Sequence, residues 1–175
     1  MNSIYVRKAN LTDLAAIMQI ITQAKALLKA DGNPQWQEGY PNTNTIEADI
    51  KNNIGNVLVV NDQVAGYAVM TTDPEPTYAV ITEGHWQNDH EAYGTIHRIA
   101  ISPDFKGLNL ARIFIITLIS KATDHGIYNF RIDTHKVNQR MQHIATSLGF
   151  IKRGQILVDT TLDPHRIGFE LNLKH

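Results

Sequence analysis

The stretch that decides the fold is GTIHRIAISPDFKGLNLARIFIITLISKA, residues 94–122. An apolar run at residues 96–101 is followed by a turn at 102–104, a basic glycine-containing loop at 106–109 and a long apolar segment. This order predicts a strand, a loop and the start of a helix. A helix N-terminus presents unpaired backbone N–H groups and the positive end of the helix dipole, so such a loop can hold an anion. The pattern predicts a site for a phosphorylated cofactor.

The composition fits one globular domain over residues 1–175. Hydrophobic residues make up 43% and charged residues 19% of the chain, which is ordinary for a protein that buries a core. Sixteen basic and seventeen acidic residues argue against a nucleic-acid binder that relies on a broad positive field. The absence of cysteine excludes disulfides and thiolate metal sites, and it favours a cytoplasmic location.

The chain shows no sequence signature of export or of a membrane span. Residues 1–10 lack the apolar segment of a signal peptide. The most apolar run, residues 113–119, is far shorter than the ~20 residues that a bilayer requires. We therefore expect a soluble cytoplasmic protein that binds neither membranes nor nucleic acid.

The first half of the chain predicts one strand, two helices and a hairpin. Alternating residues from Ile4 predict a strand, and a helical pattern opens after Thr12 and ends at residues 31–34. Thr45 is a candidate N-cap for a second, short helix. Two β-rich runs, residues 57–60 and 64–70, then form a hairpin. A long loop over residues 71–93 follows, and a loop of this length is usually either functional or disordered.

The second half adds strands and helices around the central stretch. After a strand at residues 128–133, Asn138 starts a helix and Gly149 occupies its C′ position. Two further strands cover about residues 150–158 and 167–173. The order is β-α-α-β-β-β-α-β-α-β-β, which predicts a single α/β domain with a mixed sheet of about seven strands flanked by about four helices.

Several motifs together resemble the GCN5-related N-acetyltransferase (GNAT) superfamily, in which acetyl-CoA donates an acetyl group to an amine. The resemblance covers nearly the whole chain. The motifs are the loop Lys106-Gly107-Leu108-Asn109-Leu110-Ala111, the strand Arg131-Ile132-Asp133-Thr134, Asn138 with Met141, and Leu148-Gly149-Phe150. The loop departs from the family pattern: lysine replaces arginine or glutamine at its first position, and Asn109 replaces the central glycine. Asparagine tolerates left-handed and cap conformations, so the loop can still form.

The resemblance implies which residues hold acetyl-CoA. Backbone groups of the fourth strand pair with the pantetheine arm, and amides of the loop hold the pyrophosphate. The implied cofactor-binding residues are Ile99, Ala100, Ile101, Lys106, Gly107, Leu108, Asn109, Leu110, Ala111, Arg112 and Asn138. As alternatives, Lys106 is a solvated turn residue, Arg112 a surface helix residue and Asn138 simply an N-cap.

The resemblance also implies a candidate catalytic residue. His97 stands where many family members place a general-base glutamate, and an imidazole, with a reference pKa of about 6.5, can take a proton from an ammonium near neutral pH. The alternative is that His97 only packs on the strand. The family's usual acid is a tyrosine on the following helix, and Ala145 occupies that position.

Three aromatic residues are candidates for the acceptor pocket. Trp36, Tyr40 and Trp86 lie in irregular segments, which favours a pocket wall over the alternative of core packing. Together with His97 and Arg98 they are similar to a bacterial subgroup of the family for which no substrate is implied. The eight histidines form no HxxxH or HExxH pair, so no metal site is expected.

Two functions follow from the sequence. The first is a cytoplasmic acetyl-CoA-dependent N-acyltransferase that acetylates a primary amine of a small molecule or peptide by direct transfer. The second, motivated by Ala145 and the altered loop, is an acyl-CoA sensor or partner-binding protein without turnover. A nucleotide P-loop is set aside because the Gly-Lys-Ser/Thr ending is absent. Strands near the C-terminus could pair between chains, which leaves a homodimer open.

Overall fold

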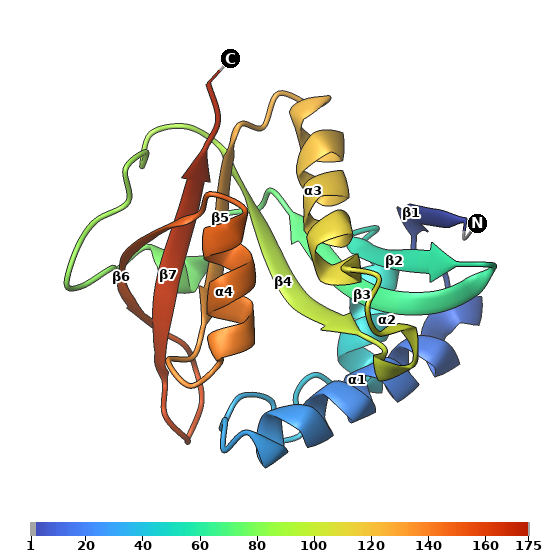
Figure 1. Cartoon of the computed structure of the whole chain (residues 1–175). Coiled ribbons are helices and arrows are strands. Elements are labelled where there is room, and N and C mark those ends of the chain that lie inside the picture. The colour runs from blue at the N-terminus through green and yellow to red at the C-terminus, as the bar shows by residue number, and fades with distance from the viewer. Residues whose placement is uncertain (1–2, 175) are drawn as a thin grey trace.

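The computed structural model describes residues 3–174, which form a sheet with helices on both faces (Figure 1). The element order confirms the predicted β-α-α-β-β-β-α-β-α-β-β. The elements are β1 (Ile4–Lys8), α1 (Leu14–Ala30), α2 (Thr43–Lys51), β2 (Gly55–Val60), β3 (Gln63–Thr71), β4 (Tyr93–Ile101), α3 (Leu110–Thr123), β5 (Asn129–Thr134), α4 (Gln139–Ser147), β6 (Ile151–Leu157) and β7 (His165–Asn172).

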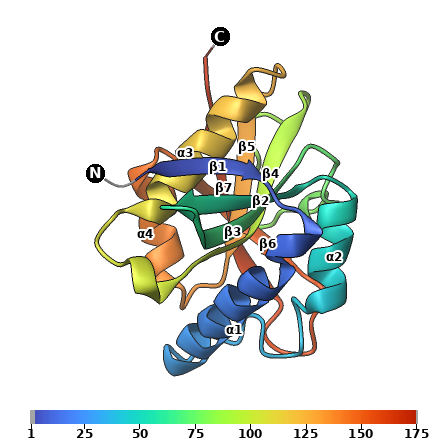
Figure 2. The same cartoon turned by 90° about the vertical axis from the view of Figure 1, so that its right-hand side faces the viewer.

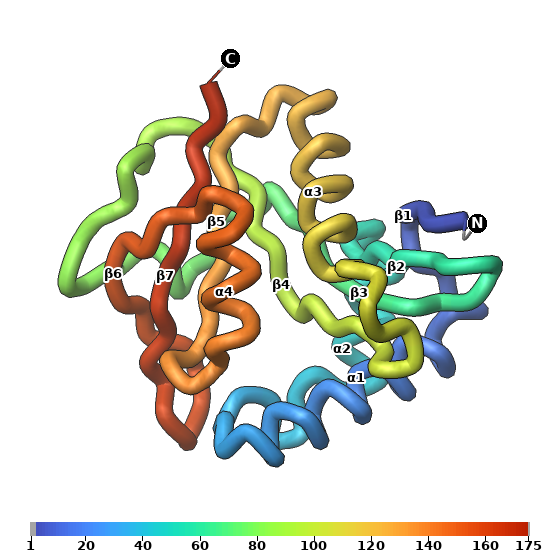
Figure 3. The backbone as a smooth tube through the Cα atoms, viewed as in Figure 1, coloured from blue at the N-terminus to red at the C-terminus, as the bar shows by residue number. Residues whose placement is uncertain are grey.

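The sheet has seven strands in the order β1-β2-β3-β4-β5-β7-β6. Every neighbouring pair is antiparallel except β4 and β5, which are parallel. Residues 93–95 of β4 pair with residues 129–131 of β5, and the pairing stops there. Beyond Thr95 the two strands diverge, as the backbone trace shows (Figure 3). Beyond this point the facing edges of β4 and β5 are not hydrogen-bonded to each other.

Alternating residues of the strands send their side chains to two separate cores. Val57 and Val59 of β2 pack with α1 and α2, whereas Leu58 and Val60 of the same strand belong to the core beneath α3 and α4. This is the period-two pattern of a strand that is buried on both faces. Figure 2 shows α1 and α2 on the opposite side of the sheet from α3. The sheet is therefore the middle layer of three.

The helix starts differ in detail from the sequence expectation. The first helix is preceded by a 3-10 turn at Leu11–Asp13, and Asn10 caps this turn in a capping box with Asp13. The predicted N-cap Thr45 is wrong, because Asn42 caps α2 and its Oδ1 accepts from the Thr45 N–H at 3.0 Å. Thr45 is the third residue of α2 and the N3 partner in that capping box, a position that resembles a cap in sequence.

One segment, Leu11–Ala30, is long and apolar enough to cross a membrane by length and composition alone. In this structure Ile17, Ile20 and Ile21 of that segment are buried in the core shared with β2 and β3. Packing against the sheet accounts for the apolar face of this helix.

The long connection between β3 and β4 is ordered. Its Tyr78 and Trp86 pack with Ile156 of β6 in a third, smaller core. The backbone N–H of Gln87 donates to the buried carboxylate of Glu170 on β7 at 2.7 Å. These anchors fasten the connection over the β6–β7 half of the sheet and fix the position of its first residues beside β4.

Candidate active site

A cavity of about 1510 Å³ lies where β4 and β5 diverge. Its walls come from α1, the segments at residues 34–40 and 158–161, β4, the β4–α3 loop, β5 and the start of α4. We call the wall formed by Lys106, Gly107, Asn109, Leu110 and Ala111 the loop side, and the wall formed by Glu75, His97, Asp133 and Arg166 the charged side. A single cavity joins the two.

The backbone of the loop side has the conformation that an anion cradle needs. Gly107 has φ +82° and Asn109 has φ 55°, ψ 33°, so both lie in the left-handed region. Asparagine is one of the few residues that adopt this region readily, which explains why Asn109 can replace a glycine. The chain then enters α3, whose first turn directs unpaired N–H groups and the positive end of its dipole to this wall.

Most of the predicted cofactor-binding residues line the cavity. They are Ile99, Ala100, Ile101, Lys106, Gly107, Asn109, Leu110, Ala111 and Asn138. Asn138 also caps α4, because its Oδ1 accepts from the Met141 N–H at 3.2 Å. Asn138 thus both caps α4 and lines the cavity, which is compatible with its two interpretations from sequence, an N-cap and a cofactor contact.

Leu108 and Arg112 are not among the residues that line the cavity, and their side chains have other partners, so only the backbone amide of Leu108 remains a candidate for the expected cofactor contact. Leu108 packs against the core beneath α3. The Arg112 Nη1 donates to the Ser147 carbonyl oxygen at 3.1 Å, at the C-terminal end of α4. The first turn of α3 points this arginine along the surface, where it links two helices.

The β4 strand carries a bulge next to the cavity. His97 is opposite Val69 of β3, whereas Ala100 is opposite Tyr67, so β4 has one extra residue between these pairs. Arg98 lies in the bulge with φ 53°. Bulges re-aim side chains and end regular pairing, and they are frequent beside active sites. Here the bulge directs both His97 and Arg98 to the cavity wall.

His97 is held by the carboxylate of Glu75, a residue outside the motifs of the sequence. The His97 Nε2 lies 3.1 Å from Glu75 Oε2, and the two side chains are 20% and 24% exposed. The hydrogen bond from His97 is the largest cause of the lowered pKa of Glu75, which falls to about 2. The Glu75 carboxylate is thus ionised at neutral pH and accepts a hydrogen bond from the Nε2–H of His97.

The other ring nitrogen of His97 is available for chemistry. Among residues 3–174, Nδ1 has no hydrogen-bond partner, and His97 lines the cavity. A neutral imidazole whose Nε2–H is donated carries its lone pair on Nδ1. A histidine oriented by a carboxylate, with its second nitrogen free in a cavity, can act as a general base.

Arg98 is fully engaged by neighbouring side chains. It donates to Asp49 through Nε at 2.9 Å and Nη2 at 2.6 Å, and the Tyr67 hydroxyl donates to the same carboxylate at 2.9 Å. The Arg98 Nη1 donates to the Tyr40 hydroxyl. A bidentate, buried pair of this kind holds the bulge and the Tyr40 loop in place. Tyr40 and Trp36 both line the cavity, as their expected wall position requires.

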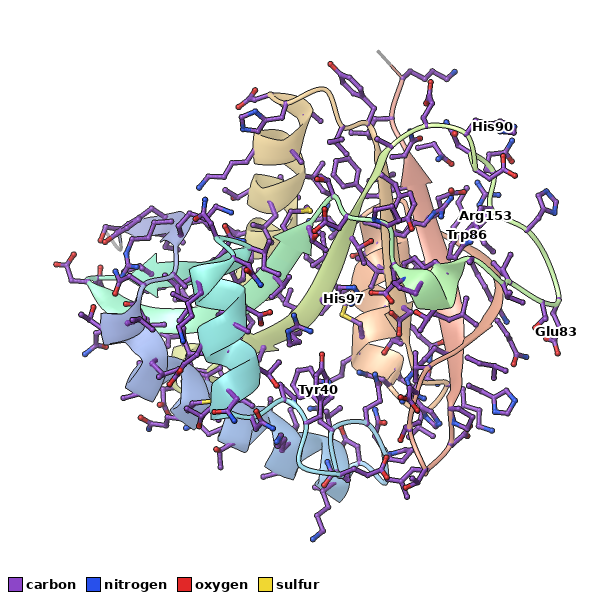
Figure 4. All side chains as sticks on the ribbon, turned by 180° about the vertical axis from the view of Figure 1, so that it is seen from behind. Tyr40, Glu83, Trp86, His90, His97 and Arg153 are labelled. Atoms are coloured by element: carbon purple, nitrogen blue, oxygen red, sulfur yellow. The ribbon has the colours of Figure 1, made fainter. Side chains whose placement is uncertain are left out.

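Trp86 does not lie at the cavity, so its expected place in the pocket wall is wrong. It is 7% exposed, its Nε1 donates to the Tyr78 carbonyl oxygen at 2.9 Å, and the Arg131 guanidinium lies 4.2 Å from its ring centre. Figure 4 shows His97 and Tyr40 near the middle of the molecule, with Trp86 and Arg153 over the β6–β7 half. The first residues of the β3–β4 connection line the cavity, but the part that carries Trp86 folds over the β6–β7 half, which places Trp86 in the third core.

The position where the family usually has its acidic tyrosine is buried in the core of this protein and does not face the cavity. Ala145 is completely buried in the core beneath α3 and α4. The residues of α4 that reach the cavity are Arg140, Met141 and Ile144. Tyr40 is a tyrosine of the cavity wall, and its hydroxyl is bonded to Arg98. Residues 3–174 contain no group of three or more His, Cys, Asp or Glu side chains that could hold a metal ion.

Comparison with known proteins identifies relatives along most of the chain. Residues 21–150 match the sequence profile of the Acetyltransferase (GNAT) family. A crystal structure of a GNAT-family acetyltransferase from Streptococcus agalactiae is 36% identical with a TM-score of 0.89, over 98% of this chain and 96% of that one. The L-amino acid N-acyltransferase MnaT of Escherichia coli is 28% identical over 153 residues, which are 86% of this chain and 81% of MnaT.

A more distant structure has the same fold. The structure of yncA from Salmonella typhimurium with its cofactor acetyl-CoA is 19% identical, with a TM-score of 0.69 over 98% of this chain and 95% of that one. At this identity the likeness concerns the fold alone. The profile match and the 36% identical relative confirm the resemblance drawn from residues 94–122 and from the segments that follow them. The chain belongs to the GNAT family of acetyltransferases.

Proposed function

We propose that this protein transfers an acetyl group from acetyl-CoA to a primary amine, directly, with both substrates in the cavity between β4 and β5. The observation that carries the proposal is that one cavity joins an anion cradle, the loop side, to a carboxylate-oriented histidine on the charged side. These are the two groups that acetyl transfer requires, a holder for the phosphorylated donor and a base for the acceptor. The match to the GNAT family of acetyltransferases supports the choice of donor.

The residues present fit acetyl-CoA. The left-handed Gly107 and Asn109 and the first turn of α3 would hold the pyrophosphate, with Lys106 adding a positive charge. The inner edge of β4 at residues 99–101 is released from β5, so its backbone groups can pair with the amides of the pantetheine arm. Apolar side chains of α4, including Met141 and Ile144, line the cavity from the other side.

The charged side would prepare the acceptor. His97 Nδ1 takes a proton from the ammonium, directly or through a water, and Glu75 stabilises the resulting imidazolium. The neutral amine then attacks the thioester carbonyl carbon, and a free N–H of β4 stabilises the oxygen as it becomes negative. Acetyl-CoA supplies the thioester whose C–S bond breaks, and the departing thiolate, with a reference pKa of about 8.5, can take up the proton that the new amide nitrogen loses. This route needs no hydroxyl at position 145.

Calorimetric titration with acetyl-CoA tests the donor site. We expect binding that Lys106→Glu weakens, because the substitution replaces an attractive charge on the cavity wall by a repulsive one. Lys51→Glu, an exposed lysine of α2 that does not line the cavity, is the matched control. Absence of binding by the parent protein would overturn the proposal, and equal effects of the two substitutions would overturn the assignment of the loop side.

The second candidate function is a protein that binds acyl-CoA without turnover. The buried Ala145 at the tyrosine position is the observation that favours it. Release of free thiol in the presence of a broad panel of amines separates the two functions. Turnover that falls sharply in His97→Ala rejects the binding protein, whereas acetyl-CoA binding with no turnover for any amine supports it.

A further inference from the structure

The charged side contains a cation whose hydrogen-bonding capacity is only partly used. Arg166 on β7 is 7% exposed and lines the cavity. Its Nη1 donates to the backbone carbonyl oxygens of Asp163 at 2.7 Å and of His165 at 2.9 Å. In the described part of the chain, its Nε and Nη2 have no hydrogen-bond partner, and no carboxylate lies within 4.0 Å of the guanidinium.

These two nitrogens are accessible to solvent, on a residue that lines the cavity and also a smaller pocket beside Lys152 and Gln155. The buried side-chain atoms without a partner in residues 3–174 are Gln23 Oε1, Thr95 Oγ1 and Arg131 Nε, and no atom of Arg166 is among them. Burial lowers the pKa of Arg166, while the charges of Asp133 and Asp163 act in the opposite direction. An incompletely paired guanidinium in a mostly buried place is costly, so it marks a position that an anion can complete.

The nearest acidic residues do not neutralise this cation. The Asp163 carboxylate is bonded to the buried His135 at 3.0 Å and to His165 at 2.8 Å. Since Val137 N–H donates to His135 Nδ1, it is the Nε2 of His135 that carries the proton donated to Asp163. The Nζ of Lys136 also lies near this carboxylate, at 3.6 Å from Asp163 Oδ2. Asp163 is therefore held by His135, His165 and Lys136, and it offers Arg166 only its backbone oxygen.

Asp133 lies beside Arg166 on the same face of the sheet. Asp133 pairs with Gly168 across β5 and β7, and Arg166 is two residues before Gly168, so the two charged residues are diagonal neighbours on one face. Asp133 Oδ1 accepts from the Tyr78 hydroxyl at 2.8 Å. Its Oδ2 has no partner among the described residues, and Asp133 lines the cavity.

This pair of opposite charges is connected to His97. The Tyr78 ring, whose hydroxyl is bonded to Asp133, lies 6.3 Å from the His97 ring, measured between ring centres. Among residues 3–174, the charged side therefore presents three kinds of group: the base His97, the free Oδ2 of Asp133 and the free Nε and Nη2 of Arg166. A base and a carboxylate suit an ammonium, and the guanidinium suits a carboxylate in the same molecule.

We propose that Arg166 binds a carboxylate of the acceptor, so that the acceptor is a small amino acid whose ammonium faces Asp133 and His97. The inference rests on the proposed acetyl transfer and adds to it the class of acceptor and the residue that selects it. Arg98 also lines the cavity, but each of its three nitrogens already donates to Asp49 or Tyr40, which makes it less suited than Arg166 to bind a carboxylate.

The test compares amino acids with their carboxamides, which keep the amine and lose the negative charge. Binding to the protein loaded with CoA is measured by calorimetry, and turnover with acetyl-CoA by thiol release. We expect at least one amino acid to bind and react at least about tenfold better than its amide, mainly through a lower KM, because hydrogen bonds to a charged group are lost in the amide. Equal affinity and kcat/KM for the acids and their amides would overturn the assignment.

Variants locate the effect. Arg166→Gln should bring the affinity and kcat/KM of the acid down to the level of its amide, whereas Arg153→Gln, on β6 and outside the cavity, should preserve the preference. If Arg166→Gln fails to fold, Arg166→Lys takes its place. This variant keeps the positive charge and should retain part of the preference for the acid. Loss of acid and amide turnover alike in Arg166→Lys, in a protein with an unchanged melting temperature, would contradict a role in carboxylate recognition.

The experiment separates this inference from the proposed function. Preferential binding of the acids with no thiol release would support the carboxylate site and remove the acetyl-transfer proposal. Thiol release with equal kcat/KM for the acids and their amides would support acetyl transfer and rule out the carboxylate site.

Discussion

The loop side and the charged side of the cavity use different parts of the chain for binding. On the loop side the backbone conformation of Gly107 and Asn109 and the N-terminus of α3 present the polar groups. On the charged side the groups are side chains from the β3–β4 connection, β4, β5 and β7. Backbone groups tolerate changes of side chain, whereas side-chain groups do not. The donor half of such a site can therefore stay constant while the acceptor half diversifies.

The largest effect should follow from removing the base on the charged side. We expect His97→Ala to lower kcat by about 10²–10⁴-fold, the usual contribution of a general base, with little change in acetyl-CoA affinity. Thiol-release kinetics and calorimetry measure the two quantities. His85→Ala, an exposed histidine of the β3–β4 connection outside the cavity, should behave as the parent protein. A similar loss of kcat in both variants would refute the role of His97.

The next effect concerns the support of the charged side. Asp49 and Arg98 are 6% and 15% exposed, and Asp49→Ala leaves the Arg98 guanidinium without its carboxylate. We expect a loss of about 3–5 kcal/mol in the free energy of unfolding, measured by urea denaturation. Asp31→Ala breaks the exposed pair with Arg140 and should cost at most about 1 kcal/mol. Equal losses would mean that the network around the bulge is not a supporting element.

A smaller effect is expected on the loop side, where conformation matters more than side-chain identity. Asn109→Val places a β-branched residue at φ 55° and should cost about 1–2 kcal/mol of stability and weaken acetyl-CoA binding. Asn109→Gly accepts the same conformation and should preserve binding. Denaturation and calorimetry on both variants check the comparison. If the glycine variant loses as much affinity as the valine variant, the Asn109 side chain itself contacts the cofactor.

The smallest effect is a pH dependence of stability from Glu75. Its pKa is about 2 in the folded protein, below the ordinary value of 4.5, so its stabilising effect is present above pH 4.5. That effect is lost as the pH falls from 4.5 to 2. We expect a contribution on the order of 1 kcal/mol after allowance for solvent screening at this open site.

Denaturation midpoints of the parent protein and of Glu75→Gln between pH 5 and about pH 2.5 measure this contribution. The difference between the two proteins should shrink as the pH falls. Glu47→Gln, which breaks the exposed pair with Lys51, serves as the control and should show a smaller change. A difference that stays constant over this range would contradict the ionic pairing of Glu75 with His97.

The same contrast between backbone and side chains explains what the sequence could predict. The loop side depends on adjacent residues, since a turn, Gly107, Asn109 and the start of an apolar helix follow one another in the chain. Asn138 and Gly149 likewise mark the ends of α4 by local capping rules that the structure confirms. The fold class and the cofactor loop were therefore accessible from short stretches of sequence.

The charged side was not predictable in this way. Glu75, His97, Asp133 and Arg166 are far apart in the chain and meet only because β3, β4, β5 and β7 are ordered as they are. Glu75 and Trp86 both lie in the loop at residues 71–93, whose path over the sheet is not encoded by a local pattern, so the sequence indicates neither the contact of Glu75 with His97 nor the burial of Trp86.

The central claim is that donor and acceptor occupy the two sides of the cavity together. Initial rates of thiol release, measured while acetyl-CoA and a reactive amine are both varied, test it most directly. The account predicts double-reciprocal lines that intersect, as a ternary complex requires. Parallel lines would contradict it, because they indicate that the enzyme itself is acetylated and that CoA leaves before the amine binds.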